Sequence, residues 1–215
     1  MSEADLKLRG LVHDLNNVFQ TILDAAELVP EGSRWKRMAT TIANSAEHGL
    51  RLTRELLESH NDSFDFSAIV ESAVQFTRDV LLVTSGPPIE FHTEVPTGLR
   101  MRGTAVGWER VLVNLFLNSA QVMKQGGAIH LRVTPLKGNL QILVWDNGPG
   151  IPEPILARIF EPHFSTKAEI EGRRKNLGLG LHIVKSIVEA HGGAVTARNR
   201  PDGGAEFEIL VKMVS

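Results

Sequence analysis

The fold of this chain is decided by two glycine-rich stretches, Asp146-Asn147-Gly148-Pro149-Gly150 and Gly178-Leu179-Gly180-Leu181. Glycine tolerates positive φ angles and lets another group approach the backbone closely. The second stretch also opens a predicted helix, and the backbone N–H groups at a helix N-terminus form a natural anion site. Either stretch alone is weak evidence, because any tight turn favours glycine. As a pair they bracket a segment suited to holding a nucleotide.

The bracketed segment, residues 151–177, is unusually long for a loop. Loops of this length inside a compact domain are mostly lids or disordered segments. Its second half carries four basic residues that could reach a polyphosphate, namely Lys167, Arg173, Arg174 and Lys175. A run of solvated surface charges is the alternative interpretation of the same residues.

A strongly apolar helix is predicted upstream, over residues 105–124. It contains Asn114 and Asn118, which are four residues apart and therefore share a face. Buried amides are costly unless they have partners, so the pair indicates a polar ligand or a divalent ion bound through the amide oxygens. Two amides on a helix surface are an equally good interpretation. The next predicted strand ends at Asp146, where a buried carboxylate could accept a hydrogen bond from an exocyclic amine such as that of adenine.

The pattern of residues 61–215 predicts an α+β fold, a two-layer sandwich with a mixed sheet and helices on one face. Strands are predicted at residues 64–66, near Met101, and over residues 89–95, 128–135, 140–145, 194–199 and 205–211. Helices are predicted over residues 67–83, 105–124 and 179–190. We expect this domain to begin at residue 61, after a polar connection.

Residues 1–60 are predicted to form an antiparallel helical hairpin. Apolar or small residues recur in steps of four and three at Leu8, Val12, Leu15, Phe19, Ile22, Ala26 and Val29, and again at Trp35, Met38, Ile42, Ser45, Gly49, Leu52 and Leu56. Residues 30–33 separate the two helices, with Ser33 as the N-cap of the second. An isolated hairpin leaves half of each apolar seam in water. We therefore expect a homodimer in which two hairpins form a four-helix bundle.

The first predicted helix also carries polar residues, among them His13, Asp14 and Asn17. His13 and Asn17 are four residues apart and share a face, and Asp14 is next to His13. In a functional interpretation His13 is a nucleophile, Asp14 accepts or orients its proton, and Asn17 orients a water molecule. Taken alone, however, a histidine on a polar helix surface is more often an ordinary surface residue.

Composition narrows the classes of function. The 215 residues include no cysteine, which excludes disulfides, thiolate metal sites and a cysteine nucleophile, and which suits a reducing cytoplasm. A net charge of -2 provides no general attraction to nucleic acid or to anionic lipid. The first residues do not resemble a signal peptide, and no apolar run reaches the length of a membrane span. We expect a cytoplasmic chain with no nucleic-acid partner and no membrane contact in this segment. Attachment to a membrane is possible only through parts not in this sequence.

Taken together, the motifs resemble the catalytic core of sensor histidine kinases. Residues 114–120 resemble the asparagine box of the ATP-binding domain that these kinases share with gyrase and MutL-type repair proteins, residues 146–150 the first glycine box, residues 160–164 the phenylalanine box, residues 178–181 the second glycine box, and residues 13–17 the phosphoacceptor box. All five occur in the order typical of the family. The resemblance covers nearly the whole chain.

The resemblance implies that ATP and Mg²⁺ bind, and it implies a role for each matching position. Asn118 would bind Mg²⁺, Asn114 would support the metal or the phosphates, and Asp146 would bind the adenine amine. The rest of the implied nucleotide site consists of Gln121, Gly148, Gly150, Lys167, Gly178, Leu179, Gly180 and Leu181. Asn114 also stands where related ATPases carry a water-activating glutamate, which favours phosphoryl transfer over hydrolysis.

The implied reaction is attack of His13 on the γ-phosphate with Asp14 as general base, followed by transfer to an aspartate of a response-regulator receiver domain. Asn17 would position water for dephosphorylating that partner. One alternative is a histidine phosphotransfer or scaffold protein whose ATP-like domain is non-catalytic; Asn176 and Gln121 motivate it, because many relatives carry glycine and a basic residue there. Another is a serine kinase or ATPase of the same superfamily, which the hairpin carrying His13 does not support.

Overall fold

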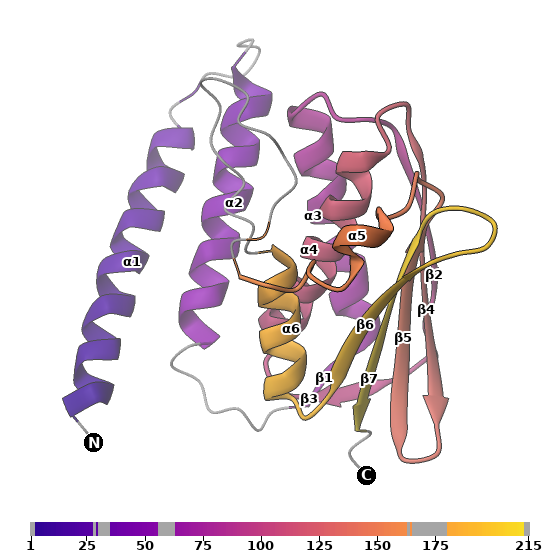
Figure 1. The fold of residues 1–215 in the computed structure, drawn as a ribbon. Helices are drawn as coiled ribbons and strands as arrows, with labels where there is room; N and C mark the ends of the chain where they lie inside the picture. Colours follow the sequence, from indigo (N-terminus) through magenta and orange to yellow (C-terminus); the bar gives the residue numbers. More distant parts are fainter. Residues whose placement is uncertain are drawn as a thin grey trace.

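A computed structural model describes residues 3–27, 29, 35–55, 63–162, 164 and 180–212 (Figure 1). The helices are α1 (Glu3–Glu27), α2 (Lys36–Glu55), α3 (Phe66–Val83), α4 (Ala105–Val122), α5 (Glu153–Leu156) and α6 (Gly180–Ala190). The strands are β1 (Ser63–Asp65), β2 (Ile89–Glu94), β3 (Arg100–Arg102), β4 (Gly127–Leu136), β5 (Asn139–Asp146), β6 (Ala194–Asn199) and β7 (Ala205–Lys212). None of the helices in the described part of the chain combines the length and the apolar character that a membrane span requires.

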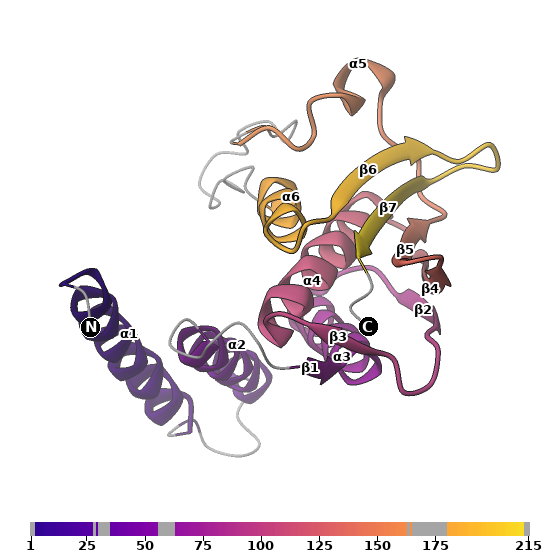
Figure 2. The ribbon, with the colours of Figure 1, turned by 90° about the horizontal axis from the view of Figure 1, so that it is seen from below.

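The predicted mixed sheet is confirmed. Its five strands are arranged in the order β2-β4-β5-β7-β6, with β2 parallel to β4 and every other neighbouring pair antiparallel. Helices α3, α4 and α6 lie on the same side of this sheet (Figure 2). A second, two-stranded sheet joins β1 to β3. The sequence indicated both short strands but not their pairing, because neither is long enough to specify a partner.

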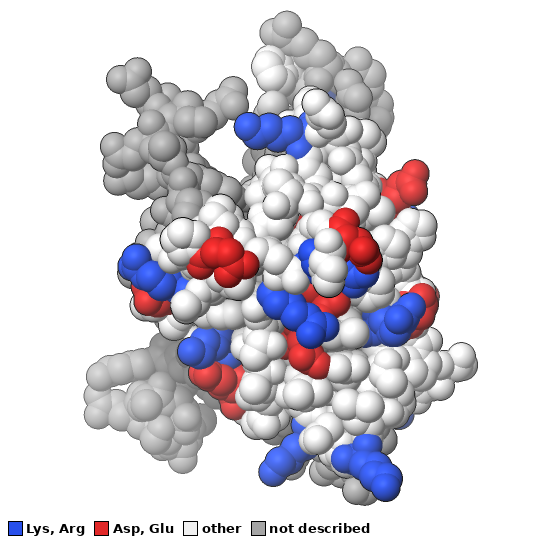
Figure 3. Space-filling view, turned by 45° about the vertical axis from the view of Figure 1, so that its right-hand side comes forward, with Lys and Arg blue, Asp and Glu red and all other residues white. Residues whose placement is uncertain are grey.

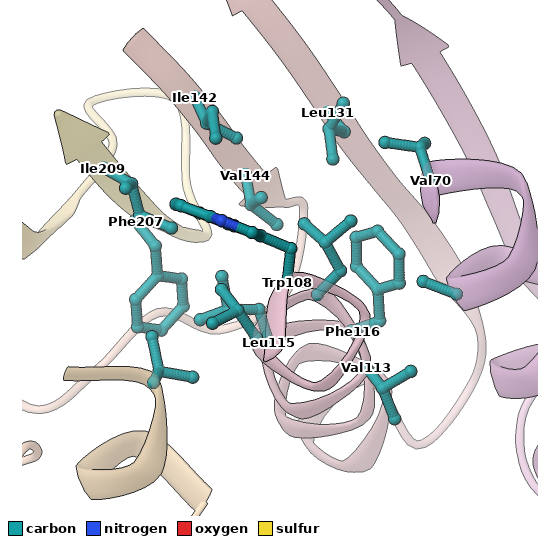
Figure 4. Packing of buried hydrophobic residues seen from close by; sticks show 14 of the residues in the cluster. Val70, Trp108, Val113, Leu115, Phe116, Leu131, Ile142, Val144, Phe207 and Ile209 are labelled. Atoms are coloured by element: carbon teal, nitrogen blue, oxygen red, sulfur yellow. The ribbon is translucent and has the colours of Figure 1, made fainter. Parts of the chain in front are cut away.

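The core lies between the sheet and these helices. Alternate residues of β5 are buried, Leu140, Ile142 and Val144 among them, as expected for a strand with one covered face. They meet α4, whose Trp108 and Leu115 are fully buried (Figure 4). Burying a large apolar side chain contributes about 1.5–3 kcal/mol. Helix α4 is therefore anchored along its length, which fixes the polar residues near its C-terminal end.

The helices α1 and α2 run antiparallel, side by side (Figures 1 and 2). Lys36 Nζ donates to the Val29 carbonyl at 3.2 Å, and near the other end the Thr53 hydroxyl donates to Asn16 Oδ1. Helix α2 in turn contacts α3 and α4. The predicted turn at residues 30–33 and the predicted domain boundary at residues 60 and 61 lie outside the described residues.

The apolar seam of α2 differs from the prediction. Gly49 faces inward, against the ring of Phe19, but Trp35, Met38 and Ile42 are 51%, 47% and 44% exposed. The buried positions are instead those of small side chains, Ala39, Ala46 and Thr53. Small residues let neighbouring helices approach closely, and this turns the large side chains of α2 toward solvent.

The segment predicted as one long loop, residues 151–177, is ordered at its start. Its first part contains the short helix α5, followed by Ile159, which is buried, and Phe160, which packs against the core. The prediction of a loop is therefore wrong for this part. Pro154 lies in the first turn of α5, where the fixed φ of proline suits the start of a helix. Residues 165–177 lie outside the described residues.

Candidate functional site

The Asp146 carboxylate is the most tightly held polar group at the end of β5. Its side chain is buried, with a relative exposure of 2%. Oδ1 accepts hydrogen bonds from the backbone N–H of Gly148 at 2.9 Å and of Ala205 at 3.2 Å. Oδ2 accepts one from the Ser119 hydroxyl at 2.7 Å. Three segments far apart in the sequence therefore converge on one carboxylate.

Glycines make this convergence possible. A Cβ on Gly148 would lie 3.0 Å from Asp146 Oδ1, closer than side-chain carbons normally come. A Cβ on Gly204, in the turn between β6 and β7, would overlap the Asp146 carbonyl oxygen. Gly204 also has a φ of +87°, which disfavours any other residue. Gly148 is among the residues predicted for the nucleotide site, whereas Gly204 is not.

The two asparagines of α4 meet the second glycine stretch. A Cβ on Gly180 would lie 3.0 Å from Asn114 Oδ1 and 3.7 Å from Asn118 Nδ2. The Asn114 amide nitrogen donates to the Arg110 carbonyl at 2.8 Å, so its oxygen is the atom turned toward Gly180. Both asparagines are half-buried. The structure thus brings the N-terminus of α6 against the asparagines that the sequence placed on one helix face.

The remaining predicted nucleotide-site residues are placed as follows. Gln121 is exposed, in the last turn of α4 and three residues beyond Asn118. Leu181 is half-buried and packs against the core. Gly150 has a φ of +77° and begins the segment that leads to α5. Lys167, Gly178 and Leu179 lie outside the described residues.

A side chain that sequence reasoning missed fixes the start of this segment. Asn199, at the end of β6, accepts from the Ile151 N–H at 2.7 Å and donates to the Ile151 carbonyl at 2.7 Å. A Cβ on Gly150 would lie 2.8 Å from Asn199 Oδ1, so the glycine makes room for the amide. In the sequence, Asn199 is distinguished only by its position at the end of a predicted strand.

A second contact joins the phenylalanine-box region to α6. His182 Nδ1 lies 3.3 Å from the Phe160 carbonyl oxygen, and the Phe160 side chain packs against the core. Nearby, the Arg158 guanidinium lies 4.8 Å from the centre of the Phe164 ring. The described part of the segment after Gly150 is thus tied to the sheet at one end and to α6 at the other.

The predicted phosphoacceptor residues lie elsewhere. His13, Asp14 and Asn17 belong to α1, where Asp14 and Asn17 are exposed and the side chain of His13 lies outside the described residues. Helix α1 packs on α2, and α2 lies between α1 and the α4–α6 region (Figure 2). The structure therefore does not bring α1, which carries His13, together with the candidate nucleotide site within one chain.

The uncovered face of the sheet carries a ladder of rings and charges. His92, His130 and Trp145 are paired across β2, β4 and β5, with ring centres 4.7 Å and 5.0 Å apart. Arginines flank Trp145, and each is also bound to a glutamate: Arg132 to Glu94 at 2.6 Å, and Arg200 to Glu206 at 3.1 Å. Figure 3 brings the sheet side forward and shows acidic and basic side chains interspersed.

This ladder shifts two pKa values. Burial lowers the pKa of His130 below its ordinary value, and the positive charges of His92, Arg200 and Arg132 lower it further, against the opposing effect of Glu94. The hydrogen bond from Arg132 lowers the pKa of Glu94. His130 is paired with Trp145, the residue before Asp146, but successive side chains of a strand point to opposite faces of the sheet, so these shifts concern the open face and not the candidate site.

The donor set suits a magnesium nucleotide. Asp146 offers an oriented acceptor to a base, the backbone at Gly148 and Gly180 is free of side chains, and Asn114 and Asn118 offer amide oxygens of the kind that Mg²⁺ accepts. Among the described residues no group of three or more His, Cys, Asp or Glu side chains could hold a metal ion. The asparagine pair is therefore the best candidate for a metal contact in the part of the chain that the structure describes.

Comparison with known proteins identifies the family. Residues 103–215 match the family described as histidine kinase-, DNA gyrase B-, and HSP90-like ATPases. The chain belongs to this family.

Its relatives are sensor kinases. The chain is 32% identical to the sensor protein KdpD of Clostridium acetobutylicum; the match covers 95% of this chain and 24% of KdpD. It is 30% identical to the sensor histidine kinase ZraS of Klebsiella oxytoca, where the match covers 94% of this chain and 44% of ZraS. The catalytic domain of histidine kinase ThkA superposes with a TM-score of 0.60 at 26% identity, covering 72% of this chain and 96% of that domain. The chain thus spans less than half the length of these two curated relatives.

Proposed function

We propose that this chain is the catalytic core of a two-component sensor histidine kinase, which phosphorylates its own His13 from Mg²⁺-ATP and passes the phosphoryl group to an aspartate of a receiver domain. The observation that carries the proposal is the meeting of Gly180 with Asn114 and Asn118, beside a buried Asp146. These residues come from the separate motifs that the family uses for one nucleotide. Their contact supports a working ATP site over a merely structural domain.

Each residue of the site then has a physical task. Asp146 would accept a hydrogen bond from the adenine amine, and Asn118 would contribute an oxygen to Mg²⁺ with Asn114 beside it. Gln121 would lie near the phosphates, and Lys167 would add positive charge from the segment after α5. Bound Mg²⁺-ATP supplies the phosphoryl group and the cation that offsets its charge. The protein contributes mainly alignment, because phosphoryl transfer depends on position and charge.

The acceptor is His13. A ring nitrogen of His13 would form a bond to the γ-phosphorus while the bond from that phosphorus to the ADP oxygen breaks, and Asp14 would accept or orient the ring proton. Asn17, one helical turn away, would position water when the phosphorylated partner is hydrolysed. The lack of a glutamate at the position of Asn114 favours transfer to His13 over direct hydrolysis of ATP.

We further propose that the two helices form a dimer, as a four-helix bundle. Five large apolar side chains of this region are 44–57% exposed, namely Leu11, Val18, Trp35, Met38 and Ile42. Within α2, Met38 and Ile42 share a face, which a second copy would cover. Since α2 lies between α1 and the nucleotide site, the catalytic domain must move, or must act on the partner's His13, before transfer. ATP and receiver domains are available in the cytoplasm, where we place this activity.

Incubation with γ-labelled ATP and Mg²⁺ tests the reaction. The wild-type chain should acquire acid-labile label, and His13→Ala should acquire none while its ATP affinity, measured by calorimetry, is unchanged. His48→Ala, which removes another histidine of the helical pair, should still be labelled. Label that survives His13→Ala would contradict the proposal. Absence of ATP binding by the wild-type chain would favour the phosphotransfer or scaffold alternative.

A further inference from the structure

Ser119 is a buried polar residue next to the candidate nucleotide site. It lies on α4, directly after Asn118, and its relative exposure is 2%. Its neighbours on the helix include Leu115, Phe116 and Ala120, which are fully buried. A buried hydroxyl is costly unless it forms a hydrogen bond. The hydrogen bond that Ser119 forms is the 2.7 Å contact with Asp146 Oδ2.

The hydrogen bond from Ser119 is the third that the Asp146 carboxylate accepts. An ionised carboxylate has about four lone-pair positions, two on each oxygen. Oδ1 uses both of its positions, because it accepts from the N–H groups of Gly148 and Ala205. Oδ2 uses one position for Ser119. Among the described residues no fourth donor reaches the carboxylate, so a single acceptor position is left, on Oδ2.

We propose that Ser119 is a specificity-determining positioning residue, which leaves Asp146 one oriented acceptor and thereby selects a purine that presents an amino group at position 6. This inference rests on the proposed ATP site and deepens it. Adenine carries a 6-amino donor, whereas guanine and hypoxanthine carry a 6-oxo acceptor. A 6-oxo group would face the remaining carboxylate lone pair, acceptor against acceptor.

Because Oδ1 of Asp146 is already occupied, the carboxylate cannot recognise a base through both of its oxygens. A carboxylate can bind the paired N–H groups of guanine with both of its oxygens. Here Oδ1 is occupied by two backbone donors, which the fold holds in place: Gly148 is two residues from Asp146, and Ala205 begins β7. A ligand that needs both oxygens therefore has no partner for its second donor.

The hydroxyl of Ser119 sets the direction of the free lone pair. The two backbone hydrogen bonds to Oδ1 restrict rotation of the carboxylate about its Cβ–Cγ bond, and the hydrogen bond from Ser119 to Oδ2 restricts it further. Without the hydroxyl, Oδ2 would have two open positions inside a buried site. Water or a turn of the carboxylate would satisfy them, and the acceptor would no longer point at the base.

The test is calorimetric titration of the full 215-residue chain with Mg²⁺-ATP and Mg²⁺-ITP. The two purines differ at position 6, which is amino in ATP and oxo in ITP, and in the proton that the 6-oxo base carries on N1. The wild-type chain should prefer ATP by a factor on the order of 100, as expected for one hydrogen bond to a charged acceptor. Ser119→Ala should weaken ATP by about tenfold and leave ITP nearly unchanged, so that the preference falls to about tenfold. Ser119→Cys, of similar size but a weak donor, should behave in the same way.

A role for Ser119 in packing alone would weaken ATP and ITP equally in both variants. That result, or an ATP preference unchanged in either variant, would overturn the inference while leaving the proposed ATP site intact. If the wild-type chain bound neither nucleotide, the proposed function itself would be wrong, and the inference with it. The thermal unfolding midpoint of each variant shows that a loss of affinity does not arise from unfolding.

Discussion

The nucleotide site and the pair of helices α1 and α2 place their polar residues in opposite ways. In the site, Asp146 is buried and accepts three hydrogen bonds from three separate segments. On α1, Asp14 and Asn17 are exposed, and on α2 the large apolar side chains Met38 and Ile42 are exposed as well. The described residues of the site come together within one chain. The helical pair exposes both polar and large apolar side chains.

The two regions differ in how rigidly they must hold their polar side chains. A group that recognises a base must be aimed before the ligand arrives, so it is fixed by the fold. In the reaction proposed above, His13 meets a catalytic domain and then a receiver domain, which requires that the helix carrying it stay accessible. Two variants, at Gly204 and Ile42, each act in one of these regions and not in the other. A third, at His130, acts on the open face of the sheet.

The largest effect is expected at Gly204. In Gly204→Ala the new Cβ would overlap the Asp146 carbonyl oxygen at a φ of +87°, which should reduce the free energy of unfolding by about 3–5 kcal/mol. Gly203→Ala is the matched control, because Gly203 also has a positive φ but nothing lies within 4 Å of its Cβ position. It should lose only about 1–2 kcal/mol. Urea unfolding followed by tryptophan fluorescence measures both, and equal losses would show that the carbonyl contact is unimportant.

A medium effect, confined to the helical pair, is expected at Ile42. Ile42→Glu places a charge on the exposed apolar face of α2 and should raise the dissociation constant of the proposed dimer by about 100-fold. The unfolding free energy of the nucleotide domain should change by less than about 0.5 kcal/mol. Sedimentation equilibrium reports the dimer. Leu82→Glu is the control, since Leu82 is 67% exposed on α3; if both variants dissociate equally, the proposed face is wrong.

The smallest effect is expected at His130, on the open face of the sheet. Because its pKa is lowered in the folded state, the unfolded chain binds a proton there first as the pH falls. The stability linked to neutral His130 is therefore complete above about pH 6.5 and is lost as the pH falls through the lower, folded pKa. His130→Gln should flatten the dependence of the unfolding midpoint on pH in this range. Below about pH 4.5 the variant and the wild type should decline in parallel, since Glu94 loses its charge in both.

Most of the nucleotide domain could be predicted from sequence, because its elements have strong local signals. The alternation in β5 and the long apolar run of α4 each specify one element, and the structure has both. The asparagine pair could be placed on one face from the spacing of Asn114 and Asn118 alone. The helix α5 was missed because four residues carry too little periodicity.

The features that the sequence does not predict depend on contacts between distant segments. The side chains of Ser119 and Asn199 look ordinary in their own neighbourhoods, and only their partners Asp146 and Ile151 give them a role. Likewise, the apolar steps of α2 indicate an amphipathic helix but not which residues meet α1. The buried residues are Ala39, Ala46 and Thr53, because small side chains let the two helices pack closely.

By itself, then, the sequence determined the kind of each element and the chemical types at the site, since periodicity, glycine and amides act locally. The tertiary structure alone decided three things: which lone pairs of Asp146 are occupied, which face of α2 stays open, and how far α1 lies from the nucleotide site. Each of these depends on the distance between segments separated by many residues, and no local pattern encodes that distance.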